Sequence, residues 1–224
     1  MTKSISPKVF FGSEGILEFT QLQVDDVFQL LGKPLKEKIE SILDELGVGS
    51  QPVIKGDVHP QAVIEGRVYI AENAKIGPSA YIQGPTYIGP EAEVRHGAFI
   101  RGTALIGPKA VVGHTTEVKG SIFGKDAKAG HFAYVGDSLL GENVNLGAGT
   151  KLANLKLKGN EVKVKHPETE ELMGSGLRKF GAILGREVQT GCNSVLSPGS
   201  MLLPKTGVLP CVHYHGTLTK GFAR

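Results

Sequence analysis

Residues 58–118 decide the fold and read VHPQAVIEGRVYIAENAKIGPSAYIQGPTYIGPEAEVRHGAFIRGTALIGPKAVVGHTTEV. An apolar residue recurs at every sixth position of this stretch, and a small residue follows most of these positions by four. A period of six fits neither an α-helix nor an ordinary strand, and it is typical of the hexapeptide repeat of a parallel β-helix. The apolar positions are Val58, Ile64, Ile70, Ile76, Ile82, Ile88, Val94, Ile100, Ile106, Val112 and Val118.

Each hexad predicts one short flat face, and three hexads predict one triangular coil with the branched residue in its interior. Glycines that directly follow the apolar residue, such as Gly77, Gly89 and Gly113, are expected at corners that need unusual backbone angles. The phase slips after Val118, and the period then continues to Leu152 and resumes from residue 184 to residue 208. We therefore expect an all-β domain, a β-helix, over residues 51–210.

Residues 153–182 interrupt the period. Their first half alternates apolar and charged residues around Gly159 and Asn160, which predicts a hairpin there, and a polar loop follows over residues 166–171. An excursion of this length from a regular solenoid is often functional. The stretch from Pro204 to Pro210 is expected to end the regular coils, so residues 211–224 are expected to form a C-terminal tail.

Residues 1–50 predict a short helical extension. Residues 21–47 read as helical with an interruption at Gly32, and Pro34 is expected to begin the second helix. Apolar residues repeat there at helical spacing, and Gly47 is expected to end the helix. The apolar stripe must pack on the rest of the chain or on a partner subunit. It consists of Leu35, Ile39, Ile42, Leu43 and Leu46.

The composition narrows the class of protein. The 224 residues are 40% apolar and 21% charged, which is too apolar for a disordered chain, and the 31 glycines are far fewer than collagen needs. The formal net charge of +3 argues against a nucleic-acid-binding protein. Neither a membrane-spanning stretch nor a secretory signal is evident, and the two cysteines make no disulfide framework, so we expect a cytoplasmic protein.

The period also predicts columns of side chains, because residues 18 positions apart lie above one another at about 4.8 Å. Once the phase slip is allowed for, His96, His114 and His131 share one column. Arg101 and Lys119 share another, and two stacked cations repel each other unless an anion lies against them. Tyr134 is expected near the corner that these two cations mark.

Three stretches carry a more specific signal. Residues 119–137 read KGSIFGKDAKAGHFAYVGD, residues 143–150 read NVNLGAGT, and residues 176–185 read GLRKFGAILG. They resemble the acetyltransferase domain of the bifunctional sugar-1-phosphate nucleotidylyltransferase/acetyltransferase family, which includes N-acetylglucosamine-1-phosphate uridyltransferase. The resemblance implies a left-handed winding, a homotrimer with sites between subunits, and acetyl transfer from acetyl-CoA to an amino-sugar 1-phosphate. Residues 1–50 are too short for that family's nucleotidyltransferase domain, which we expect to be lacking.

The resemblance also implies site residues. His131 is the expected catalytic base and Tyr134 its catalytic neighbour, because histidine titrates near neutral pH and the sugar amine must lose a proton. Arg101 and Lys119 are the expected phosphate ligands. Further substrate contacts are implied for Asn145, Asn154 and Lys163, and contacts with acetyl-CoA for Ala148 and Cys192, the latter in place of the family's serine.

Two other classes of function stay open. The histidine column would suit a zinc enzyme of the carbonic-anhydrase type, although that family pairs two histidines closely in sequence, and His213 and His215 alone are too few ligands for a metal. We therefore expect no metal. A non-catalytic β-helix scaffold that partners a separate nucleotidyltransferase is the third hypothesis.

Overall fold

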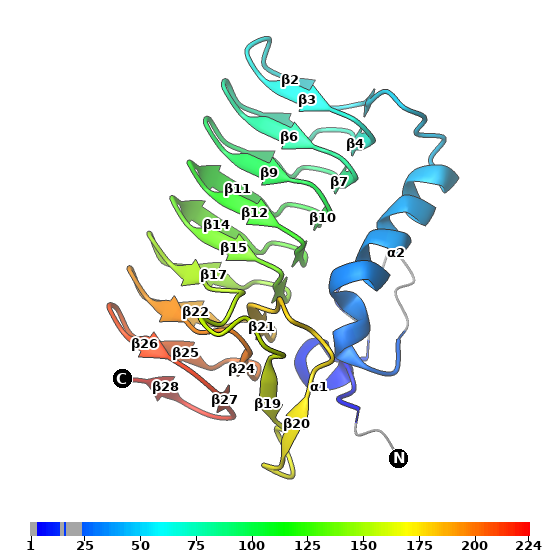
Figure 1. Cartoon of the computed structure of the whole chain (residues 1–224). Coiled ribbons are helices and arrows are strands. Elements are labelled where there is room, and N and C mark those ends of the chain that lie inside the picture. Colours follow the sequence, from blue (N-terminus) through cyan, green and yellow to red (C-terminus); the bar gives the residue numbers. More distant parts are fainter. Residues whose placement is uncertain (1–3, 14–15, 17–23) are drawn as a thin grey trace.

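The computed structural model describes residues 4–13, 16 and 24–224. It is the predicted left-handed parallel β-helix, built from short strands that form three flat sheets around a common axis (Figure 1). Strands that are neighbours within one sheet come from successive coils, so every ladder between them is parallel. The hexapeptide period therefore predicted both the class and the architecture correctly.

Sheet A has nine strands, of which β1 is the first. They are β1 (Val53–Ile54), β4 (Val68–Ile70), β7 (Thr86–Ile88), β10 (Ala104–Ile106), β13 (Ile122–Phe123), β16 (Leu139–Leu140), β21 (Ala182–Leu184), β24 (Ser200–Leu202) and β27 (Thr217–Leu218).

Sheet B also has nine strands. They are β2 (Asp57–Val58), β5 (Lys75–Ile76), β8 (Glu93–Val94), β11 (Val111–His114), β14 (Lys128–His131), β17 (Asn145–Leu146), β22 (Gln189–Thr190), β25 (Gly207–Val208) and β28 (Phe222–Ala223).

Sheet C has eight strands. They are β3 (Val63–Glu65), β6 (Tyr81–Gln83), β9 (Phe99–Arg101), β12 (Glu117–Lys119), β15 (Tyr134–Gly136), β18 (Lys151–Leu152), β23 (Val195–Leu196) and β26 (His213–Tyr214). Of these strands, β9 and β12 end on Arg101 and Lys119.

The interior of the helix is a continuous column of apolar side chains from the inward position of each hexad. Ile70, Ile88 and Ile106 are fully buried in it, and the small residues Ala92 and Ala110 fill the corners. Burial of a side chain of this size contributes about 1.5–3 kcal/mol to the free energy of unfolding. The repeat therefore stabilises every coil by the same means.

The glycines after the inward residue serve another purpose than the one expected. Gly77, Gly89 and Gly113 do not have positive φ angles, whereas many corners place ordinary residues such as Asn73, with φ 60°, in the left-handed region. A Cβ atom on Gly113 would lie 1.7 Å from the carbonyl oxygen of Gly130 in the next coil. These glycines are thus required by the close approach of successive coils rather than by unusual backbone angles.

The N-terminal extension lies along the outer face of sheet A (Figure 1). It contains α1 (Lys8–Phe11), the 3-10 helix η2 (Val27–Leu30) and α2 (Gly32–Glu45), so the second helix begins two residues before the expected Pro34. Residues 21–23 of the predicted helical stretch lie outside the described residues. Gly47, with φ 71°, follows the end of α2 as expected.

The apolar stripe of α2 packs on the rest of this chain, except for Leu46, which is exposed. Leu35, Ile39 and Leu43 are fully buried in one cluster with residues of sheet A, including Tyr87 and Leu105. A second cluster therefore covers the outside of one face of the β-helix. The helix is also tied to the coils by Arg67, whose guanidinium donates to the carbonyl oxygen of Val48 at 2.8 Å, pairs with Asp44 at 2.5 Å and pairs with Glu40.

The excursion leaves the coils after β18 and returns at β21, close to the expected bounds. Its hairpin is displaced from the prediction: β19 (Lys163–Lys165) pairs with β20 (Leu172–Gly174), and the polar loop between them is the turn. His166 closes that loop, because its Nδ1 accepts the backbone N–H groups of Glu168 and Thr169 at 3.2 and 3.3 Å. Gly159 instead ends a separate tight turn that begins at Lys156.

The regular coils do not end at Pro210. β26, β27 and β28 each pair in parallel with the strand one coil earlier, so residues 211–224 continue the β-helix instead of forming a tail. Pro204 lies at a corner between β24 and β25, where a residue without an N–H interrupts no ladder. In the part of the chain that the structure describes, no helix is long and apolar enough to cross a membrane.

Candidate active site

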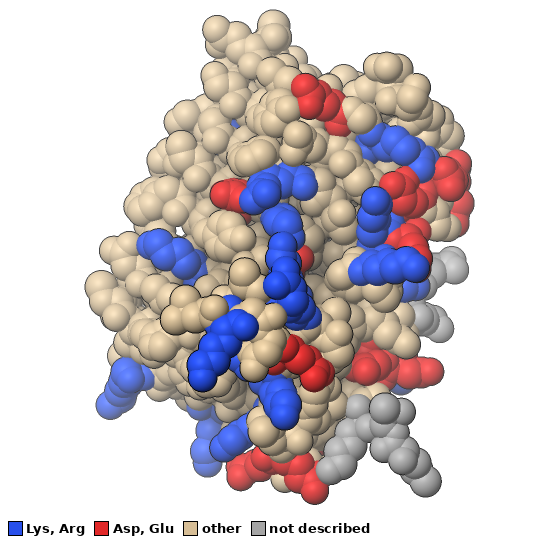
Figure 2. All heavy atoms as spheres, viewed as in Figure 1, with Lys and Arg blue, Asp and Glu red and all other residues tan. Residues whose placement is uncertain are grey.

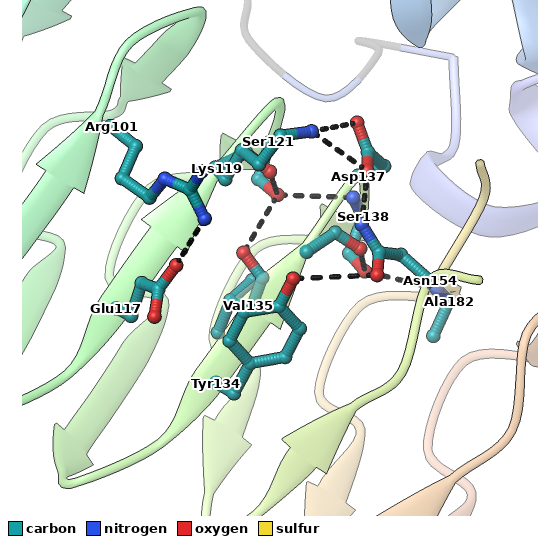
Figure 3. Close-up of polar contacts among 11 residues, drawn as sticks. Arg101, Glu117, Lys119, Ser121, Tyr134, Val135, Asp137, Ser138, Asn154 and Ala182 are labelled. Carbon is teal, nitrogen blue, oxygen red and sulfur yellow. Dashed lines mark hydrogen bonds and ion pairs between the residues drawn. The ribbon is translucent and has the colours of Figure 1, made fainter.

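The first group of site residues lies where the strands of sheet C end, and we call it the corner cluster. Arg101 and Lys119 end β9 and β12 in adjacent coils, as the column predicted. Each cation already has a carboxylate partner: Arg101 donates to Glu117 at 2.8 Å, and Lys119 lies 3.1 Å from Asp137 (Figure 3). The repulsion between the stacked cations is therefore offset within the chain and does not by itself require a bound anion.

Asp137 is the centre of the corner cluster. It is buried, and its carboxylate accepts the ammonium group of Lys119 at 3.1 and 3.2 Å and the side-chain amide of Asn154 (Figure 3). The hydroxyl of Tyr134 donates to the other end of that amide, Asn154 Oδ1, at 3.3 Å. One carboxylate thus orients a lysine, an asparagine and, through the asparagine, a tyrosine.

The backbone makes room for this network. A Cβ atom on Gly136 would lie 2.7 Å from the hydroxyl of Tyr134 and 2.9 Å from Cγ of Asn154. Beneath it, Ser121 accepts the N–H of Ser138 at 3.0 Å, and Ser138 donates to the carbonyl of Gly136 at 2.8 Å. The corner is therefore held by buried hydroxyl groups that pair with the backbone, and its side chains project from a fixed support.

Electrostatics define the protonation of the corner cluster at neutral pH. Burial raises the pKa of the Tyr134 phenol above its ordinary value, and the negative charges of Glu117 and Asp137 raise it further, so Tyr134 is a neutral donor. The hydrogen bond to Glu117 raises the pKa of the Arg101 guanidinium. The group presents fixed cations and neutral donors, which suit a phosphorylated or hydroxylated ligand.

The second group lies on sheet B, around His131 at the end of β14. His96, His114 and His131 form the predicted column, with ring centroids 5.1 Å apart for the first pair and 5.4 Å for the second. A hollow of about 610 Å³ lies beside His131, and Asn145, Ala148 and Cys192 also line it. We call it the histidine hollow. Its volume is in the range of small-molecule sites.

The histidine hollow is lined by backbone N–H groups, those of Ala148 and Cys192, for which no acceptor is found among the described residues. The N–H groups of Asn145 and Gly147 donate to the carbonyl oxygens of Val188 and Thr190 in the next coil. Ala148 lies outside the strands, and among the described residues no acceptor of its N–H is found. The sequence resemblance implied a contact between Ala148 and acetyl-CoA, and the N–H of Ala148 is a donor that such a contact could use.

The predicted site residues therefore fall into three places. Arg101, Lys119, Tyr134 and Asn154 meet in the corner cluster. Three more, Asn145, Ala148 and Cys192, share the histidine hollow with His131, and Phe132 at the corner between the two groups is half exposed with φ 36°. The structure does not bring Lys163 to either group, because it lies on the excursion hairpin and lines a separate hollow with Tyr214 and His215.

Sequence reasoning missed Glu117 and Asp137. The column rule does not give Asp137, because after the phase slip the partner of Lys119 in the next coil is Gly136 and Asp137 follows it in the corner. Strand alternation could have found Glu117, which lies two residues before Lys119 on the same outward side of β12.

Among the residues that the structure describes, no group of three or more histidine, cysteine, aspartate or glutamate side chains is placed to hold a metal ion. The histidine column consists of one stacked pair of rings, His96 and His114, and one edge-on pair, His114 and His131.

The chain is similar to one family model and to several known proteins. The family model described as the GMPPB C-terminal domain matches residues 82–213, more than half of the chain. A protein of Methanococcus aeolicus named bifunctional protein GlmU is 44% identical over 146 residues, which are 65% of this chain and 35% of that protein. A bifunctional sugar-1-phosphate nucleotidylyltransferase/acetyltransferase of Sulfurisphaera tokodaii is 41% identical over 144 residues, 64% of this chain and 35% of that protein.

These matches confirm the resemblance seen in the sequence, and the chain spans about a third of the length of these two relatives. Among solved structures, the acetyltransferase domain of PglB from Neisseria gonorrhoeae has a TM-score of 0.33 at 12% identity, covering 81% of this chain and 62% of that one. PerB from Caulobacter crescentus, solved with CoA and GDP-perosamine, has a TM-score of 0.33 at 13% identity and covers 80% of this chain and 61% of that one.

Proposed function

The chain belongs to the family of GMPPB C-terminal domains, and on that premise we propose that it is an acetyl-CoA-dependent N-acetyltransferase of an amino-sugar 1-phosphate. The relative whose name gives both nucleotidylyl transfer and acetyl transfer supports the acetyl-transfer chemistry. The single observation that carries the proposal is the corner cluster, in which two cations, a neutral tyrosine and an asparagine converge one corner away from His131.

The proposed reaction uses both groups. The sugar amine attacks the thioester carbonyl of acetyl-CoA, the new C–N bond forms, and the C–S bond breaks. His131 accepts the proton that the amine loses and returns it to the leaving thiolate. The N–H of Ala148 stabilises the charge that develops on the carbonyl oxygen, because a donor aimed at that atom favours the transition state over the ground state.

The corner cluster holds the acceptor in this proposal. Arg101 and Lys119 bind the phosphate, and their carboxylate partners give them fixed positions before the sugar arrives. The phenol oxygen of Tyr134 accepts from a sugar hydroxyl group, and the second amide N–H of Asn154 donates to another. Asp137 acts as a positioning residue, because it touches Lys119 and Asn154 and is itself buried.

Acetyl-CoA occupies the histidine hollow in this proposal, with Asn145, Ala148 and Cys192 along its path. We further propose a homotrimer with sites between subunits. The distribution of the site residues supports it, since Lys163 lies away from both groups within one chain and a neighbouring copy is then needed to supply that lysine.

The test is release of free CoA thiol from acetyl-CoA in the presence of glucosamine 1-phosphate or galactosamine 1-phosphate. The proposal predicts sugar-dependent release with at least one of the two, and an acetylated sugar amine as the second product. No release with either sugar above the rate without sugar would contradict the proposed substrate class.

A further inference from the structure

A second hollow continues the corner cluster toward the C-terminal coils, and we call it the excursion hollow. It has a volume of about 630 Å³ and lies between the first residues of the excursion and the ends of β23 and β26. Ala153 and Leu155, which flank Asn154 of the corner cluster, both line it. A ligand that fills this hollow therefore lies next to the corner cluster along the chain.

Part of the lining of the excursion hollow is apolar and open. Leu155 is 43% exposed, Leu157 has its whole side chain in solvent, and Pro198 also lines the hollow. Exposed leucines that line one hollow are unusual on a monomeric surface, where large apolar groups are normally scattered. Their aliphatic surfaces suit a planar ring, which gains from leaving water.

Other residues that line the excursion hollow are basic. Lys156, Lys158, His213 and His215 line the excursion hollow, and of its described lining residues none is acidic. Lys156 donates to the carbonyl oxygen of Glu161 at 3.1 Å, so one of its N–H groups is held, and its ammonium group pairs with no carboxylate of the described residues. His213 contacts the hydroxyl of Ser197 at 2.7 Å, which orients its ring.

The histidine hollow gives a direct contrast. It has a similar volume, but Glu91, Glu93 and Asp126 line it together with its lysines and Arg95, so its charges are mixed. In the excursion hollow the lysines have no such partners among the described lining residues. Figure 2 shows basic side chains in a row down the face that carries sheet C and the excursion. A cationic hollow that also has apolar lining residues favours a ligand that has both negative charge and a planar ring.

We propose that the excursion hollow binds a nucleoside diphosphate, with the base against Leu155, Leu157 and Pro198 and the diphosphate on Lys156 and Lys158. A sugar joined to that diphosphate would extend to the corner cluster. The inference rests on the proposed function for the identity of that sugar, but the nucleotide site itself does not depend on acetyl transfer.

The experiment measures binding of UDP and GDP to the full chain by isothermal titration calorimetry, with uridine and inorganic pyrophosphate as probes of the two halves of the ligand. The proposal predicts that at least one nucleoside diphosphate binds about tenfold or more tightly than either half. Binding of pyrophosphate as tight as that of UDP and GDP overturns it, because charge alone then explains the affinity.

Substitutions at two exposed positions test the basic and the apolar lining residues separately, and neither position is part of the core. Lys158→Ala and Leu157→Ser are each expected to weaken nucleotide binding by about tenfold or somewhat less, since both side chains are open to solvent. Lys205→Ala is the matched control, because this exposed lysine does not line the hollow. Unchanged affinity in both hollow variants overturns the proposal, as does a change in self-association in place of affinity for Leu157→Ser.

A nucleoside diphosphate reaches a protein either as part of a nucleotide sugar or as the adenosine 3′-phosphate 5′-diphosphate end of CoA. Competition between UDP or GDP and CoA distinguishes these sources. If the full chain releases thiol but binds neither UDP nor GDP, this inference alone is contradicted. If it binds a nucleotide but releases no thiol, only the proposed function is contradicted.

Discussion

Sheets A and C are made of the same hexads, yet their outer faces differ in every property that matters for function. The outward residues of sheet A include Tyr87, Leu105 and Ile122, and the N-terminal extension buries them. The outward residues of sheet C include Arg101 and Lys119, and they stay open to solvent. Interior and exterior of a strand are thus specified separately, because successive side chains point to opposite faces.

The difference teaches where to look for function in a solenoid. The inward residues repeat from coil to coil and report only the fold, so they do not distinguish one sheet from another. The outward residues do not repeat. On sheet A they form a docking face for α2, and on sheet C they form the corner cluster, in which the side chain of Arg101 is exposed.

The largest effect is expected on the outer face of sheet A, which the N-terminal extension covers, and the variant that tests it is Leu105→Ala. Leu105 is fully buried between sheet A and the extension, so its truncation leaves a cavity and is expected to lower the free energy of unfolding by about 2–5 kcal/mol. Urea unfolding measures the change. Thiol release per folded molecule should stay at the wild-type rate, and a loss below about 1 kcal/mol would show that the extension does not pack as described.

The corresponding test of the outer face of sheet C is the variant Arg101→Ala. The pair that Arg101 makes with Glu117 is exposed, so the free energy of unfolding should change by less than about 1 kcal/mol. The KM for the sugar phosphate should rise about tenfold or more, because a charged hydrogen bond to the phosphate is lost. Lys205→Ala is again the control, and an unchanged KM in Arg101→Ala would remove this residue from the phosphate site.

The smallest effect concerns Tyr87 on the covered outer face of sheet A, whose contribution to stability depends on pH. Burial, with a smaller contribution from the charge of Tyr69, raises the pKa of Tyr87 from 10.0 to about 12. Since the raised pKa favours the neutral phenol in the folded state, its contribution to stability is complete below pH 10 and is lost as the pH rises toward about 12.

Ultraviolet absorbance of tyrosinate measures this directly. The wild-type protein should show a phenol that titrates at about pH 12, and Tyr87→Phe should lack it. The variant should also lose less stability than the wild type over the same interval. A complete titration of all phenols near pH 10 would mean that Tyr87 is accessible to water in the folded protein.

The sequence predicted most of the β-helix because a six-residue period has one structural solution. It also predicted the histidine column and the stacking of Arg101 on Lys119, since positions 18 residues apart must coincide in space. The same rule does not give Asp137, because the phase slip sets Gly136 beside Lys119 in the next coil, and Asp137 lies in the corner that follows.

Other features were beyond a pattern of hexads. The glycines of the corners are set by contacts between coils, as the contact of Gly113 with Gly130 shows, and such contacts are not visible in one strand. The place of the extension on sheet A depends on outward residues such as Tyr87 and Leu105, which lie outside the repeat. The excursion hairpin closes on His166, a residue whose role as a turn acceptor has no periodic signal.

The central claim is that acetyl transfer takes place between the corner cluster and the histidine hollow with His131 as the base. The most direct measurement compares sugar-dependent thiol release by His131→Ala and by His96→Ala, its matched control two coils away in the same column. The account predicts that His131→Ala loses at least about a hundredfold in kcat and that His96→Ala retains the wild-type value. Equal activity of the two variants would contradict it.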